Sequence, residues 1–192
     1  MQDLIQRILI TGIPASGKST QAGLLRFRRI RVRDLRKSNC QTSFSFYTSL
    51  SNDMKIRLKE LISNPEETAK QTSGIYRNLS KYKFFNNYVL DGVLFDITDA
   101  KYLLKKDLIN KVIVLNLGEE EARKRAEFIR EHHFEIEYSN LYFNKRIQIF
   151  KENTLPAINY LREKSSENLS LIEIDASKSK EEISKEISSF LN

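Results

Sequence analysis

Residues 12–19 read Gly12-Ile13-Pro14-Ala15-Ser16-Gly17-Lys18-Ser19 and match the pattern G-x-x-x-x-G-K-[ST] in full. The two glycines let the backbone adopt conformations that a side chain would hinder. Such a loop turns successive N–H groups toward an anion, at the positive end of a helix. The stretch therefore predicts a phosphate-binding loop.

Each residue of this loop has an expected task. Lys18 would reach the β- and γ-phosphates of a nucleoside triphosphate, and the Ser19 hydroxyl would hold Mg²⁺. The residues expected to bind the nucleotide are Gly12, Ala15, Ser16, Gly17, Lys18, Ser19 and Thr20.

The flanks of the loop favour this interpretation over a chance Gly-Lys-Ser turn. Residues 7–11 form a short apolar run of the kind that a buried parallel strand needs. Residues 19–25 have the composition of the first turns of a helix. Strand, glycine loop and helix is the order that the motif requires.

A second candidate site residue is Asp91, at the end of the apolar run Tyr88-Val89-Leu90-Asp91-Gly92. An aspartate at the end of a strand is the Walker B form, whose carboxylate organises Mg²⁺ directly or through water. A plain Asp-Gly turn is the alternative. The phosphate-binding loop favours the functional reading, so we expect Ser19 and Asp91 to hold the metal.

Apolar runs at 7–11, 88–91, 111–117 and 170–175 alternate with helical patterns, which predicts an α/β fold. We expect the P-loop NTPase fold, a parallel β-sheet flanked by helices on both faces, with a short lid insert. Pro156 should kink or break one long helix, and Ser177 or Ser179 should cap the last one. The expected helices cover residues 53–62, 64–81, 119–131, 141–164 and the segment to Leu191, with another opening at Asp96.

Composition limits the function classes. The 192 residues contain no linker-like boundary, so residues 1–192 should form a single P-loop kinase-like domain. No apolar run approaches the ~20 residues that span a bilayer, and no secretory leader is evident. The one cysteine, Cys40, fits a reducing compartment, and we expect a cytoplasmic monomer.

The net charge of +7 suits phosphorylated substrates as well as nucleic acid. Seven of the twelve residues at 26–37 are basic. Alternation across 29–33 predicts a second strand, and a continued helix is the competing interpretation. The stretch is either a solvated basic face or an anion-binding wall, so nucleic acid is possible there but not favoured.

The order of these motifs resembles the adenylate kinase branch of the nucleoside monophosphate kinases. Residues 12–25 are similar to the family's G-x-P-x-x-G-K-[GS]-T-Q-A-x-x-L, and residues 88–92 to its "ILDG" element. The similarity continues through residues 112–125 and 172–176. It also includes Lys145-Arg146-Ile147 and, further on, Pro156-Ala157-Ile158-Asn159-Tyr160. It covers nearly the whole chain.

The resemblance implies that ATP, with Mg²⁺, is the phosphoryl donor. It implies that Arg125 lies near the adenine and that Arg146 reaches the phosphates in flight. A short lid at about 130–144 lacks the family's arginine, for which Arg130 would substitute. The implied catalytic residues are therefore Lys18, Arg125, Arg146 and Arg130.

The departures from the family gather in the acceptor-binding region, at about 31–80. Val93-Leu94-Phe95 replaces the family's "FPR", and Asp99 stands where a glutamine reads the acceptor adenine. Lys37 also stands where an arginine is usual. We expect the lost charge to come from Arg31, Arg33, Arg36 or Lys37.

Three functions follow from this pattern. The first is transfer of the γ-phosphoryl group of Mg·ATP to a nucleoside monophosphate, by an active or a catalytically weak enzyme. The second is a non-catalytic ATP-binding or nucleic-acid-associated module that uses residues 26–37. The third is a small-molecule kinase of the shikimate or gluconate type. The first is favoured, with nucleotides as partners and no membrane.

Overall fold

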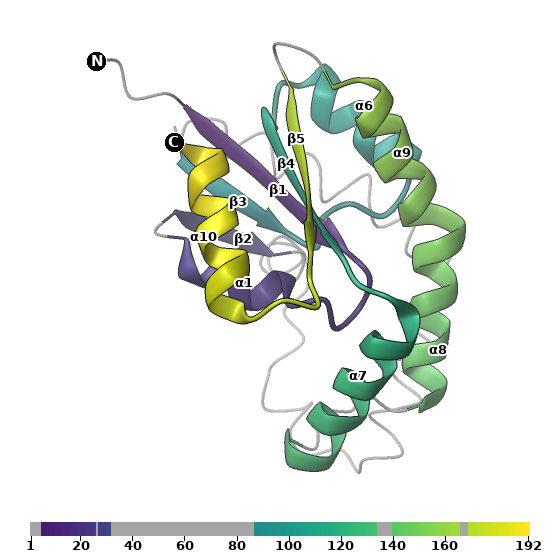
Figure 1. Ribbon diagram of the computed structural model, residues 1–192. Coiled ribbons are helices and arrows are strands. Elements are labelled where there is room, and N and C mark those ends of the chain that lie inside the picture. The colour runs from purple at the N-terminus through teal and green to yellow at the C-terminus, as the bar shows by residue number, and fades with distance from the viewer. Residues whose placement is uncertain (1–4, 26, 32–86, 134–139, 166–168) are drawn as a thin grey trace, which may run out of the picture.

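The computed structural model describes residues 5–25, 27–31, 87–133, 140–165 and 169–192 (Figure 1). The helices expected at 53–62 and 64–81 lie outside these residues. The strands are β1 (Gln6–Gly12), β2 (Arg28–Arg31), β3 (Asn87–Asp91), β4 (Lys111–Asn116) and β5 (Ser170–Asp175). The helices are α1 (Lys18–Leu24), α6 (Ile97–Lys105), α7 (Glu119–His133), α8 (Asn140–Ile149), α9 (Leu155–Glu163) and α10 (Lys180–Leu191).

The five strands form one sheet in the order β2-β3-β1-β4-β5, and all neighbouring pairs are parallel. β1 lies at the centre, between β3 and β4. Its residues Ile8, Leu9 and Ile10 have no exposed surface, which explains the unbroken apolar run. The phosphate-binding loop therefore leaves the carboxyl end of the central strand.

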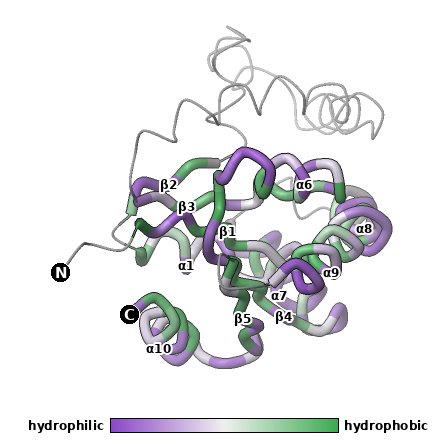
Figure 2. The backbone as a smooth tube through the Cα atoms, turned by 90° about the horizontal axis from the view of Figure 1, so that it is seen from above, coloured by the Kyte–Doolittle hydropathy of each residue, from purple (hydrophilic) through white to green (hydrophobic). Residues whose placement is uncertain are grey.

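Helices cover both faces of the sheet, as the sequence predicts (Figures 1 and 2). On one face, Leu9 and Leu90 pack in a cluster with residues of α6 and α9. On the other face, Ile8 and Ile10 pack with residues of α1 and α10. Packing on both faces fixes the position and direction of β1, and therefore the position of the loop that follows it.

A third apolar cluster lies beyond the end of the sheet. Ile13 of the loop packs there with Ala122 and Ala126 of α7 and with Phe143 and Ile147 of α8. This contact seats α7 and α8 beside the loop (Figure 1). The functional site described below lies at this junction.

The expected strands are all confirmed, and the strand alternative is correct for Arg28–Arg31. The long helix expected at 141–164 is confirmed, with an irregularity just before Pro156. A π-helical turn at Phe150–Thr154 joins α8 to α9 without a gap, and Pro156 stands in the first turn of α9. Proline has no N–H to donate, so the first turn of a helix is where it is tolerated.

Within the described segments, no helix has both the length and the apolar character that crossing a bilayer requires.

Candidate functional site

The loop geometry requires glycine at its first position. Gly12 has φ +144°, and a Cβ built there would lie 2.4 Å from the carbonyl oxygen of Leu115 on β4. Gly17 has φ +87° and precedes α1 directly. Ala15 has φ +64°, an uncommon backbone conformation for a residue with a side chain. Strain of this kind gathers at ligand-binding loops.

Lys18 folds back over the loop. Its Nζ donates to the carbonyl oxygens of Gly12 at 2.8 Å and Ile13 at 2.6 Å, and lies 3.3 Å from Ser16 Oγ. The pKa of Lys18 is lowered to about 7 by loss of hydration and, next, by the positive charge of Arg146, while the charge of Asp91 opposes the change. The carbonyl oxygens carry no full negative charge, so an anion in the loop would favour the ammonium form.

Ser19 and Asp91 meet as the sequence predicts. Ser19 Oγ donates to Asp91 Oδ2 at 2.9 Å, across the carboxyl ends of β1 and β3. A hydroxyl and a carboxylate are suitable oxygen ligands for Mg²⁺, which takes its remaining ligands from water and substrate phosphates. In the part of the chain that the structure describes, no group of three His, Cys, Asp or Glu residues competes as a metal site.

Arg29 also contacts this carboxylate, and sequence reasoning did not single it out. Its Nε and Nη2 lie 3.0 and 2.5 Å from Asp91 Oδ2. The alternating pattern at 29–33 was the sequence signal that could have pointed to Arg29, because it predicts a strand with its arginines on one face. In the structure β2 runs parallel to β3 with Arg31 opposite Asp91. Arg29 lies two residues earlier, on the same face of the sheet.

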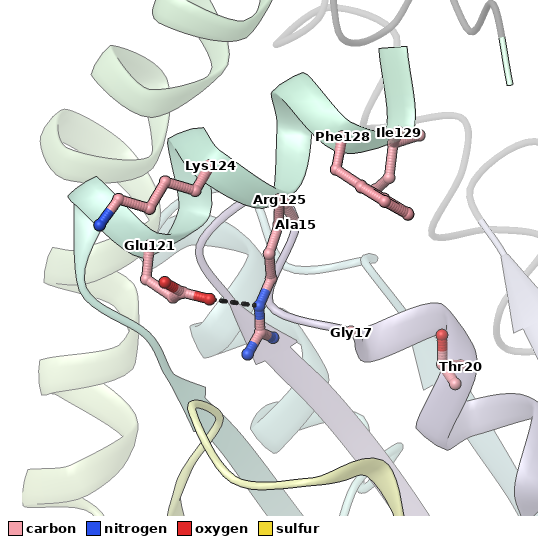
Figure 3. A pocket seen from close by; sticks show the side chains of 8 residues that line it. All are labelled: Ala15, Gly17, Thr20, Glu121, Lys124, Arg125, Phe128 and Ile129. Atoms are coloured by element: carbon pink, nitrogen blue, oxygen red, sulfur yellow. Dashed lines mark hydrogen bonds and ion pairs between the residues drawn. The ribbon is translucent and has the colours of Figure 1, made fainter. Parts of the chain in front are cut away.

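A pocket of about 510 Å³ opens between the loop and α7 (Figure 3). Arg125 lines it, and its Nε lies 3.2 Å from Glu121 Oε1. Phe128 lines it as well, is 58% exposed, and stacks on His132 with ring centroids 4.0 Å apart. The full lining is Ala15, Gly17, Thr20, Glu121, Lys124, Arg125, Phe128 and Ile129. Phe128 carried no motif signal in the sequence.

The other predicted site residues are placed less closely together. Arg146 lies in the last turn of α8, near enough for its charge to affect Lys18. Arg130, on α7, pairs with Glu127 at 3.1 Å and does not line the pocket. Arg31 belongs to β2, but its side chain lies outside the description. So do Arg33, Arg36 and Lys37, and part of the expected lid at about 130–144.

Asp99 is 2% exposed and belongs to the N-terminal cap of α6. Its Oδ2 accepts from the backbone N–H groups of Phe95 at 2.7 Å and Asp96 at 3.4 Å. Burial raises the pKa of Asp99 to about 7, against the lowering effect of these two hydrogen bonds. Asp99 stands where adenylate kinases have a glutamine that reads the acceptor base, and its carboxylate is instead taken up by the cap of α6.

No family model matches the chain. It is 31% identical to an adenylate kinase of Buchnera aphidicola subsp. Cinara cedri (strain Cc) over 127 residues, which are 62% of this chain and 54% of that protein. The chain thus spans about half the length of this relative. It is 25% identical to an adenylate kinase of Phytoplasma australiense, over 94% of this chain and 95% of that protein.

Among solved structures, the crystal structure of shikimate kinase from Aquifex aeolicus vf5 is similar, with a TM-score of 0.50. The identity is 17%, over 97% of this chain and 96% of that one, so this likeness concerns the fold alone. The loop and the all-parallel sheet show an α/β P-loop fold, and the chain is similar in sequence to adenylate kinases.

Proposed function

We propose that this chain transfers the γ-phosphoryl group of Mg·ATP to a nucleoside monophosphate. The observation that carries the proposal is the meeting of Lys18, Ser19 and Asp91 at the carboxyl ends of adjacent strands. In open parallel sheets, this edge is where ligands bind. The two adenylate kinases among the relatives support a nucleotide as the acceptor.

In this proposal the loop amides hold the triphosphate, and Lys18 exchanges its carbonyl partners for phosphate oxygens. Ser19 and Asp91 hold magnesium, which neutralises phosphate charge when bound. Arg125 and Phe128 pack against the adenine, since guanidinium and aromatic faces both suit a flat base. Arg146 reaches the transferred group, assisted by Arg130 from the lid at about 130–144.

The acceptor site is proposed to differ from that of the family. Asp99 is committed to the α6 cap, so base recognition must fall to other residues. Arg31, Arg33, Arg36 and Lys37 are proposed to supply the charge for the acceptor phosphate. The protein is proposed to act as a cytoplasmic monomer with one domain over residues 1–192.

The test is coupled ADP release from Mg·ATP with AMP, CMP, UMP, GMP and dTMP in turn. We expect one of the five to support turnover. Lys18→Met should remove it, by a factor on the order of 100 or more, because the loop backbone would remain without its positive charge. Lys185→Met, on the exposed side of α10, makes the same substitution outside the site and should retain the rate.

Absence of turnover with all five acceptors would contradict the kinase proposal. If ATP binding persisted in that case, the chain would be an ATP-binding module without phosphoryl transfer to nucleotides.

A further inference from the structure

Three donor groups converge on a single oxygen of the proposed metal ligand. Asp91 Oδ2 accepts from Ser19 Oγ at 2.9 Å and from Arg29 Nε and Nη2 at 3.0 and 2.5 Å. The Asp91 side chain is 5% exposed and that of Arg29 27%. The negative charge that would attract magnesium is therefore already paired with a permanent positive charge of the protein itself.

The fold holds this pair in place. Arg31 is in register with Asp91, and Arg29 is in register with Val89. Arg29 must therefore reach diagonally along the face of the sheet, a distance that a long side chain spans. Gly23 of α1 lies over this path: a Cβ built there would be 3.7 Å from Arg29 Nη1. A Cβ at that distance would make an ordinary van der Waals contact, so α1 passes the guanidinium without crowding it.

A cation held against a mostly buried carboxylate weakens the attraction of that carboxylate for a second cation. The effect is strong where water screens poorly, as it does around Asp91. The pairing therefore reduces the advantage of Mg·ATP over free ATP.

We propose that Arg29 is a built-in cation of the metal site, which lowers the dependence of nucleotide binding on magnesium. The inference rests on the proposed donor site and adds to it a positioning residue that competes with the metal for Asp91. It concerns equilibrium binding and is independent of which acceptor the protein uses.

The experiment measures the dissociation constant of ATP by calorimetry at pH 8, once with excess Mg²⁺ and once with EDTA. The ratio of the EDTA value to the Mg²⁺ value is the magnesium-linked gain. We expect Arg29→Gln to raise this gain about five- to tenfold over the unmodified protein, the usual size of a coupling between neighbouring sites.

The matched control is Arg28→Gln. Arg28 is exposed, belongs to the same strand and carries the same charge, but its side chain alternates to the other face of the sheet. Its replacement should leave the gain unchanged. Arg29→Lys keeps the charge without the forked donors and should raise the gain less than Arg29→Gln does.

Removing Arg29 alone leaves a buried carboxylate unpaired and can prevent folding. The double variant Arg29→Gln/Asp91→Asn avoids this problem. It should show the same small gain as Asp91→Asn alone, since Arg29 acts through Asp91. Two results would overturn the inference about Arg29 only. The first is a magnesium-linked gain that Arg29→Gln leaves unchanged. The second is a gain that differs between the double variant and Asp91→Asn. Failure of the unmodified protein to bind ATP in either buffer would overturn the donor site as well.

Discussion

Among the described glycines, Gly12 is the one where the surrounding backbone leaves least room for a side chain. A Cβ there meets the Leu115 carbonyl oxygen at 2.4 Å, and the φ of +144° disfavours any other residue. We expect Gly12→Ala to lower the free energy of unfolding by about 1–3 kcal/mol. It should also remove ATP binding, because the loop must shift away from β4. Urea unfolding and calorimetry measure the two effects.

Gly23→Ala is the control for this substitution. Gly23 lies inside α1 with an ordinary φ, and its nearest neighbour to a built Cβ is Arg29 Nη1 at 3.7 Å. Because alanine favours helix over glycine by ~1 kcal/mol, we expect no loss of stability or a small gain. Equal destabilisation by both substitutions would contradict the steric argument for Gly12.

Single residues also mark the limit of sequence reasoning about the site. Lys18, Ser19 and Asp91 could be predicted because the chemistry of a phosphate-binding loop fixes residue types at fixed spacing. Arg29 could not, because its contact depends on the register between β2 and β3, which the sequence does not state. Phe128 is a similar case: its role as pocket lining depends on how α7 packs on Ile13.

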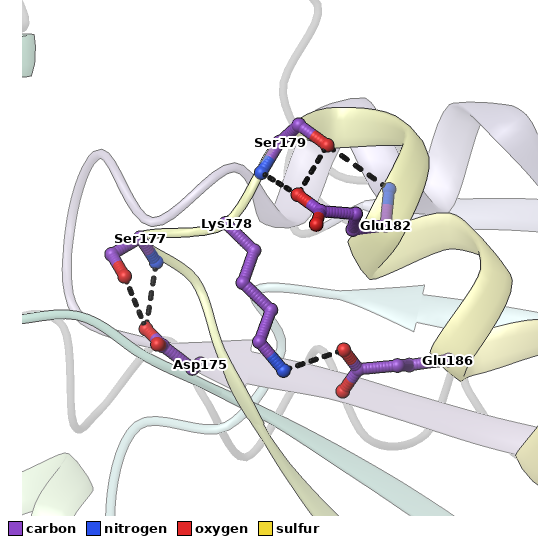
Figure 4. Close-up of polar contacts among 6 residues, drawn as sticks. All are labelled: Asp175, Ser177, Lys178, Ser179, Glu182 and Glu186. Atoms are coloured by element: carbon purple, nitrogen blue, oxygen red, sulfur yellow. Dashed lines mark hydrogen bonds and ion pairs between the residues drawn. The ribbon is translucent and has the colours of Figure 1, made fainter.

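Among the elements, α10 shows how a cap is selected. Sequence spacing left Ser177 and Ser179 open, and the structure selects Ser179 (Figure 4). Ser179 Oγ accepts from the Glu182 N–H at 3.3 Å, and Glu182 Oε2 accepts from the Ser179 N–H at 2.9 Å. Ser177 donates instead to Asp175 Oδ1, through N at 2.9 Å and Oγ at 2.7 Å.

This difference predicts unequal effects of the same substitution. Ser179→Ala should lower the free energy of unfolding by about 1 kcal/mol, because the Glu182 N–H at the start of α10 loses its acceptor and Glu182 Oε2 loses the Ser179 hydroxyl. Ser177→Ala removes an exposed hydrogen bond and should cost less than half as much. Urea midpoints at one pH measure both. Equal losses would show that the capping box does not stabilise α10.

Elements were predicted well where the pattern of apolar residues alone decides them. The central strands are continuous apolar runs, a pattern that burial on both faces of a sheet explains. Pro156 predicted a kink or break in the helix at 141–164, but it did not predict that the irregularity would be a π-helical turn at Phe150–Thr154. The π-helical turn upstream depends on packing against the rest of the molecule, since Thr154 Oγ1 donates to the Phe95 carbonyl at 3.0 Å.

At the scale of the whole molecule, the shifted pKa values of two groups give opposite pH dependences. The pKa of Asp99 is raised from 3.8 to about 7. The folded state therefore binds more protons than the unfolded state between these values, and stability falls as pH rises toward 7. The pKa of Lys18 is lowered from 10.5 to about 7. The unfolded state binds more protons above pH 7, so stability rises again.

We therefore expect the contribution of these two groups to unfolding free energy to be lowest near pH 7 without nucleotide. Urea unfolding between pH 5 and 9 measures it, well below the pKa of Tyr88, which burial raises to about 12. Asp99→Asn should flatten the acid side and Lys18→Met the alkaline side, each leaving the other side unchanged. ATP should also flatten the alkaline side, because phosphate favours protonated Lys18. An alkaline slope that survives both Lys18→Met and ATP would place its origin in another group.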